Sequence, residues 1–151
     1  MLEGFLDWQR GTLLHKCAGL TGEQLARKAC LPSDLSLLGL VRHMTDVERT
    51  WFRRRFAGQD LDGVYWREDA PKAAFADVDP AGAEADLARL VAEQEAARKA
   101  VAGLSLDDVF VSERWGEMSL RWCYGHMTAE YARHCGHADL LRERVDGVTG
   151  A

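Results

Sequence analysis

Apolar residues recur along most of the chain with the spacing of an α-helix, and short breaks divide this pattern into segments. Alternation typical of a β-strand occurs only in fragments such as Val109–Val111. The pattern therefore predicts helix nearly everywhere. The expected long helices cover about residues 2–19, 37–57, 80–102 and 120–145, with a shorter helix near 21–29.

The expected helix boundaries carry the residues that commonly begin and end helices. Ser36 and Ser119 each precede a long apolar-periodic segment, where a side-chain oxygen can accept a hydrogen bond from the first turn. Asp79 is followed by a proline, the residue preferred at the first helical position. Gly58 and Gly103 follow the ends of two segments. These signals support the four long helices.

Four long helices joined by two extended connections predict an all-α fold, a four-helix bundle. The 151 residues fit a single domain spanning 1–151. Residues 59–79 form one connection, which includes Gly63 and Pro71 and has no helical period. A loop of this length is usually functional or mobile.

Charge and hydropathy exclude several classes of protein. The chain has 24 Asp and Glu against 19 Lys and Arg, a net charge of −5, which argues against a dedicated nucleic-acid binder. The Arg53–Arg55 run is interpreted as a favourable charge at a helix C-terminus rather than as an RNA site. No apolar run is long enough for a membrane span, and the first ten residues carry two acids where a signal peptide is basic. We therefore expect a cytoplasmic protein without a membrane partner.

The four cysteines are scattered, and no C-x-x-C pair is present. Disulfide frameworks and structural zinc sites have different spacings. We expect four reduced cysteines that act mainly as small apolar side chains.

The last long segment carries an unusual polar stripe. His126, Glu130, His134 and His137 fall within about 80° of one another on a helical projection. A stripe of this kind is normally the apolar seam of a bundle helix. Burying imidazoles and a carboxylate without partners would cost several kcal/mol, so another group is expected to satisfy them.

A second polar residue lies on an apolar face. His43 is placed between Leu40 and Val47, away from Arg42 and Asp46. Taken alone, it is typical of a hydrogen-bonded core histidine, and a Glu-x-x-x-His pair alone is typical of a helix surface. Facing helices of a bundle, however, are where carboxylates and imidazoles build metal sites. The two anomalies together predict a metal site between the second and fourth long helices.

Three segments resemble the DinB superfamily, specifically its DUF664-like branch, which is related to mycothiol-dependent maleylpyruvate isomerase and to thiol S-transferases. They read FLDWQRGTLLHKCAGLTGEQL, LLGLVRHMTDVERTWFRR and MSLRWCYGHMTAEYARHCGHADLLRERVDG. The resemblance covers essentially the whole chain and is weakest across residues 59–118. It implies a four-helix bundle that holds a divalent metal through one side chain of the second helix and two of the fourth.

Carried over residue by residue, the resemblance implies His43, Glu130 and His134 as the metal ligands. This chain departs from the family pattern in having two further histidines on the same helix. His126 lies four residues before Glu130 and is an alternative to it as a ligand. His137 lies near His134 on the same stripe, and we expect it to line the open side of the site as a catalytic residue that orients substrate or bound solvent. Asp46 and Asp139 are candidates to support the ligands.

Two imidazoles and one carboxylate leave coordination positions open, which is typical of a catalytic site. Zinc is the first expectation, with nickel or iron as alternatives, because the same ligands suit several ions. The resemblance implies a metal-dependent transferase that activates a low-molecular-weight thiol such as mycothiol for attack on an electrophile, and it implies a homodimer. The alternatives are a metal-dependent hydrolase and a non-catalytic, metal-containing stress or ligand-binding protein.

Overall fold

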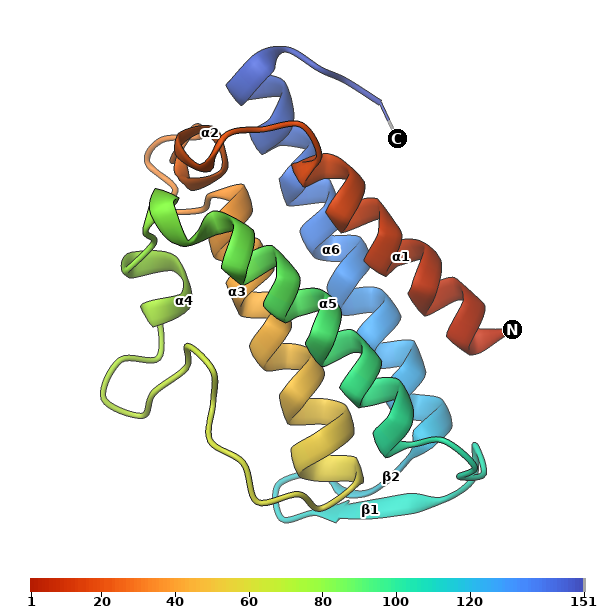
Figure 1. Ribbon diagram of the computed structural model, residues 1–151. Helices are drawn as coiled ribbons and strands as arrows, with labels where there is room; N and C mark the ends of the chain where they lie inside the picture. The colour runs from red at the N-terminus through yellow and green to blue at the C-terminus, as the bar shows by residue number, and fades with distance from the viewer. Residues whose placement is uncertain (151) are drawn as a thin grey trace.

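The computed structural model describes residues 1–150 and shows a mostly helical chain (Figure 1). The described part contains six α-helices, one π-helix, one 3₁₀-helix and one small sheet. In chain order the elements are α1 (Leu2–Cys17), α2 (Gly22–Ala26), α3 (Leu37–Glu48), the π-helix η1 (Arg49–Phe56), α4 (Ala73–Ala76), the 3₁₀-helix η2 (Pro80–Gly82), α5 (Ala83–Ala100), β1 (Val109–Ser112), β2 (Gly116–Ser119) and α6 (Leu120–Asp146).

The long helices α1, α3, α5 and α6 lie side by side and share one apolar core (Figure 1). Helix α1 packs along α6, α5 packs along α3, and α3 also contacts α6. The sequence signals for two helix starts are confirmed: the side chains of Ser36 and Ser119 accept hydrogen bonds from Gly39 N and Trp122 N. These caps fix the first turns of α3 and α6, the two helices on which the predicted site residues lie.

A buried polar network connects all four long helices. Arg10 on α1 donates two hydrogen bonds of 2.7 Å to the carboxylate of Glu48 on α3. The same carboxylate accepts a hydrogen bond of 2.8 Å from Tyr131 Oη on α6. Gln94 on α5 in turn donates to Tyr131 Oη at 3.0 Å. Each charged or polar group thus has a partner, which allows the network to sit inside the apolar core.

Two stretches differ from the expected elements. The expected helix over 37–57 begins at Leu37, but it changes after Glu48 into the π-helix η1. Hydrophobic spacing did not reveal this change, because a segment of eight residues is too short to distinguish the period of a π-helix from that of an α-helix.

The expectation of an all-α fold is wrong for the connection before α6. Strands β1 and β2 form an antiparallel hairpin at one end of the helices, with Phe110 opposite Met118 (Figure 1). Gly116 adopts a φ of 75° where the second strand begins. The strands are too short, and too few of their side chains are buried, to produce a clear alternation of apolar and polar residues.

The connection over 59–79 covers the outer face of α3 and contains the short helix α4 (Figure 1). Its backbone is fixed by Asp46, whose carboxylate accepts hydrogen bonds from the N–H groups of Val64, Tyr65 and Trp66. Arg42 lies over the ring of Tyr65, 4.4 Å from its centroid. Arg42 and Asp46 are therefore buried beneath this connection, although the sequence pattern placed them away from the apolar face.

Two simple expectations can be compared directly with the structure. All four cysteines are free, as expected. Within residues 1–150, no helix combines the length and the apolar content that crossing a membrane would require.

Candidate metal centre

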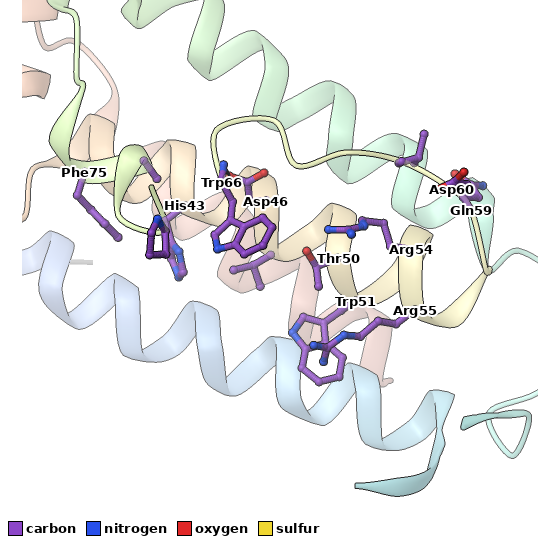
Figure 2. Close-up of a pocket in the computed structure, with 14 residues that line it drawn as sticks. His43, Asp46, Thr50, Trp51, Arg54, Arg55, Gln59, Asp60, Trp66 and Phe75 are labelled. Atoms are coloured by element: carbon purple, nitrogen blue, oxygen red, sulfur yellow. Dashed lines mark hydrogen bonds between the residues drawn. The ribbon is translucent and has the colours of Figure 1, made fainter. Parts of the chain in front are cut away.

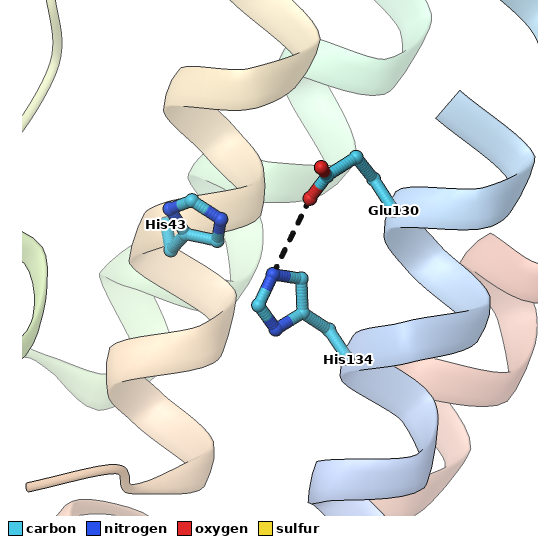
Figure 3. A group of neighbouring side chains, drawn as sticks. All are labelled: His43, Glu130 and His134. Atoms are coloured by element: carbon cyan, nitrogen blue, oxygen red, sulfur yellow. Dashed lines mark ion pairs between the residues drawn. The ribbon is translucent and has the colours of Figure 1, made fainter. Parts of the chain in front are cut away.

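The structure brings together the three residues implied as metal ligands. His43 projects from α3, and Glu130 and His134 project from successive turns of α6 (Figure 3). One potential ligand atom from each residue lies within 4.8 Å of the other two. The i, i+4 spacing places Glu130 and His134 on one face of α6, and the packing of α3 on α6 supplies His43.

The individual contacts within this triad are short. Nε2 of His134 lies 3.5 Å from Oε2 of Glu130. The rings of His43 and His134 meet edge to face, with 4.7 Å between their centroids. The nitrogen and oxygen atoms thus converge on one point between the two helices (Figure 3).

The two imidazoles of the triad are held in the protonation state that a metal ion needs. Burial, together with the neighbouring rings of His43 and His137, lowers the pKa of His134 to about 4. Burial also lowers the pKa of His43, although the charge of Glu130 opposes this. Both imidazoles are therefore neutral at pH 7, with their lone pairs free for coordination.

The donor set and its spacing fit a divalent ion. Ligands about 2.0–2.2 Å from a tetrahedral zinc ion lie about 3.3–3.6 Å from one another, and the separation of Glu130 and His134 falls within this range. Two imidazoles and a carboxylate would leave a fourth position for a substrate or a solvent molecule. The arrangement therefore has the ligand number of a catalytic site rather than of a closed structural site.

His137 lies beside the triad, close to His134 on the same helix. Its Nδ1 is 3.3 Å from Nδ1 of His134, on the opposite side of that ring from Glu130. It is not among the residues that line the large pocket described below. The contact is suited to fixing the tautomer and orientation of His134, because one of the two nitrogens donates to the other.

The other candidates on α6 and α3 have different surroundings. His126 packs against the rings of Trp51 and Trp122, with centroid distances of 4.3 and 4.9 Å, and does not belong to the converging group. Asp139 forms an ion pair with Lys16. Asp46 is occupied by backbone N–H groups of the covering connection.

The polar stripe on α6 lies at the margin of the core. His134 is buried, whereas His126, Glu130 and His137 are half-buried. The fully buried side chains of α6, such as Met127 and Tyr131, lie beside the stripe. The stripe is therefore only partly covered, and three of its four polar side chains keep some contact with solvent.

A pocket of about 630 Å³ opens beside His43 and was not expected from the sequence. It runs along α3 and η1 beneath the connection over 59–72, and its walls include Trp51, Trp66 and Phe75 (Figure 2). Arg54 and Arg55 line it farther along η1. The pocket is large enough for a small organic ligand. The sequence signals were the long connection and the arginine run, which only the fold brings together.

Comparison with known protein families places the chain. A model of the mycothiol-S-transferase family matches residues 1–147. The chain belongs to this family. The match covers nearly all of the chain and confirms the resemblance to the DinB superfamily and its mycothiol enzymes. No curated protein and no solved structure matches the chain. In this chain, the converging triad and the adjacent pocket are the features on which a proposal about its reaction can be built.

Proposed function

We propose that the protein is a metal-dependent thiol S-transferase built on a DinB-type four-helix bundle, in which His43, Glu130 and His134 bind one divalent ion. The observation that carries this proposal is the convergence of these three side chains beside a pocket of about 630 Å³. The family description supports mycothiol as the thiol. Zinc is the preferred ion, and nickel or iron is compatible with the same ligands.

The ion would supply a Lewis acid that lowers the pKa of a thiol or water bound to it. The chain itself supplies two neutral imidazoles and one carboxylate, so a dication keeps a net positive charge at the site. That charge favours an anionic sulfur over a neutral thiol. The pocket beside His43 offers space for the electrophile within reach of the same point.

The transfer reaction balances without an oxidant or reductant. The thiol loses its proton to solvent, and its sulfur forms a bond to an electrophilic carbon. The leaving group departs from that carbon with the electron pair of the bond that breaks. Trp51 and Phe75 give the pocket aromatic walls against which an apolar part of the electrophile can pack.

We assign His137 to this site as a residue that positions His134. Its contact with Nδ1 of His134 leaves Nε2, which faces Glu130, as the nitrogen directed at the ion. The sequence-based expectation that His137 contacts substrate is a separate hypothesis. The two roles differ in kinetics, because a positioning residue changes metal affinity, whereas a substrate contact changes KM or kcat at full metal occupancy.

The test is conjugation of monobromobimane to mycothiol, bacillithiol or glutathione by purified protein reconstituted with zinc, nickel or iron. We expect thiol-dependent turnover with mycothiol that disappears after chelation and returns when metal is added. His43→Ala protein is expected to be inactive, and exposed His15→Ala protein to be fully active.

Other results would favour the alternative functions. Thiol-independent cleavage of ester or amide substrates by the metal-loaded protein would favour a hydrolase. A filled metal site without turnover of any thiol would favour a non-catalytic, ligand-binding protein. Equal turnover by wild-type and His43→Ala proteins would overturn the assignment of the site.

A further inference from the structure

The three consecutive arginines at the end of η1 have different surroundings. Arg53 donates hydrogen bonds of 2.8 Å to Glu93 and 2.9 Å to Gln59. Within residues 1–150, Arg54 and Arg55 form no ion pair, and both line the pocket that begins at His43. A helix-dipole interaction alone does not explain why two uncompensated cations face a cavity.

Arg55 is held in place without being neutralised. Its guanidinium carbon lies 4.2 Å from the ring centroid of Trp51 and 5.2 Å from that of Trp115. Cation–π contacts of this kind orient the planar group but leave its N–H donors free. Nη1 of Arg55 is buried and has no hydrogen-bond partner among the described residues. A buried, unsatisfied cationic donor is costly unless a ligand supplies an acceptor.

The pocket end that holds Arg54 and Arg55 keeps a net positive charge, because the two arginines outnumber the one acid near them, Asp60. Two acids line the pocket, Asp46 and Asp60. The carboxylate of Asp46 is already used by the backbone N–H groups of the covering connection. Asp60 is exposed and forms no ion pair within the described chain. Burial and the adjacent charge of Arg54 lower the pKa of Arg55, as expected for a cation without a nearby counter-charge.

Arg54, Arg55 and one residue of the triad, His43, line the same cavity. Figure 2 shows His43 towards one end and Arg54 and Arg55 farther along the same helical axis. Their positions on the helix are separated by roughly 17 Å, given a rise of about 1.5 Å per residue. Trp51 lies between them and contacts His126, which precedes Glu130 by one turn of α6. A ligand that reaches both ends must therefore be extended and partly apolar.

We propose that Arg54 and Arg55 bind an anionic group of the electrophile, with its reactive carbon directed towards His43. This inference rests on the proposed thiol transfer, and it names the substrate class as an extended, partly aromatic electrophile that ends in a carboxylate or sulfonate. Two adjacent guanidinium groups are suited to such an oxyanion, because their N–H donors form paired, charge-assisted hydrogen bonds. Trp51 and Trp66 supply the apolar wall between the two ends.

The test measures binding rather than turnover, on zinc-loaded protein, by isothermal titration calorimetry. The probes are 4-phenylbutyrate and its neutral amide, which differ in charge but hardly in shape. We expect the acid to bind wild-type protein at least tenfold more tightly than the amide. Arg54→Gln and Arg55→Gln are each expected to remove most of that preference, while affinity for the amide stays nearly constant and so reports on correct folding.

Arg114→Gln is the matched control. Arg114 also lies over Trp115, at 5.1 Å, but it does not line the pocket. It is expected to retain the preference for the acid. Equal affinity of wild-type protein for acid and amide would overturn the proposal, and so would a loss in Arg114→Gln equal to that in Arg55→Gln.

The bimane assay keeps this inference separate from the proposed function. A preference for the acid in a protein that conjugates no thiol would support the anion site and overturn the transferase assignment. Thiol conjugation without any preference for the acid would overturn the anion site and support the transferase.

Discussion

Two polar clusters lie among the long helices, and they differ in how completely their groups are paired. Around Glu48, Arg10 and Tyr131 meet the carboxylate directly, and Gln94 completes the network from the fourth helix. Around His134, the nitrogen and oxygen atoms converge without closing on one another, and His43 makes no hydrogen bond within the described chain. The first cluster is chemically closed, whereas the second has capacity left for a ligand.

This difference indicates that the cluster around Glu48 contributes to folding, whereas the cluster around His134 is available for function. In the cluster around Glu48 every charged group has a hydrogen-bond partner, so loss of one partner would leave a buried charge uncompensated. Burial raises the pKa of Tyr131 well above its usual value, so its hydroxyl remains a donor to Glu48. In the open cluster, burial lowers the pKa values of two imidazoles and keeps their lone pairs available.

Breaking the closed cluster should have the largest effect on stability. Glu48→Ala leaves the Arg10 charge buried without its partner and should lower the free energy of unfolding by about 3–5 kcal/mol. Guanidinium denaturation monitored by circular dichroism measures this loss. The control is Glu95→Ala, which removes an exposed partner of Arg98 and Lys99 and should cost less than about 1 kcal/mol. Similar losses in the two variants would contradict the distinction.

Filling the open cluster should stabilise the fold by mass action. Zinc at about 100 times its dissociation constant adds about 2.7 kcal/mol, which corresponds to a rise in Tm of about 5–10 °C at this chain length. Differential scanning calorimetry in EDTA and in zinc measures the rise, and His43→Ala should abolish it. A rise of the same size in His43→Ala would show that zinc binds elsewhere.

Acid should destabilise the metal-free protein through the open cluster. His134 has a pKa of about 4 in the folded chain and about 6.5 when unfolded. Above about pH 6.5 it is neutral in both states and contributes nothing. Between about pH 6.5 and 4 the unfolded chain binds the proton and the folded chain does not. The free energy of unfolding therefore decreases as the pH is lowered, by about 2 kcal/mol from pH 7 to pH 5. Unfolding curves in EDTA should show a flatter pH dependence for His134→Gln than for His15→Gln, and identical slopes would refute this origin.

Removing the side chain that contacts the far nitrogen of His134 should have the smallest effect, a change in metal affinity. His137→Gln removes the imidazole next to Nδ1 of His134, and such outer contacts typically change metal affinity about 10-fold or more. Competition with a chromophoric chelator measures the change. His126→Gln alters a histidine of the same stripe that packs on tryptophans and should leave the affinity within about twofold. Unchanged affinity in both variants would remove His137 from the site.

The sequence predicted those features that depend on local residue spacing. Ser36 and Ser119 marked helix starts correctly, and the i, i+4 relation of Glu130 and His134 follows directly from α6. Their partnership with His43 was predicted from two polar anomalies on apolar faces, and the resemblance then implied which of the histidines are ligands. The closed network around Glu48 was missed, since its members are far apart in sequence and each is an ordinary polar residue of an amphipathic helix.

The pocket could not be predicted from periodicity. It depends on the connection over 59–72 being fixed by Asp46, and on the π-turns that carry Arg54 and Arg55. Irregular backbone of this kind leaves no repeating apolar pattern, and the arginine run was equally compatible with a simple helix end. Sequence reasoning therefore identified the candidate ligands of the site but not the cavity beside them.

The central claim is that three particular side chains hold one ion, and elemental analysis tests it most directly. Wild-type, His134→Ala and His126→Ala proteins are loaded with zinc, passed through a desalting column and analysed for zinc per folded chain. Wild-type and His126→Ala proteins should retain about one zinc ion per chain, and His134→Ala should retain almost none, because only two ligands remain. Full retention of zinc by His134→Ala would contradict the account.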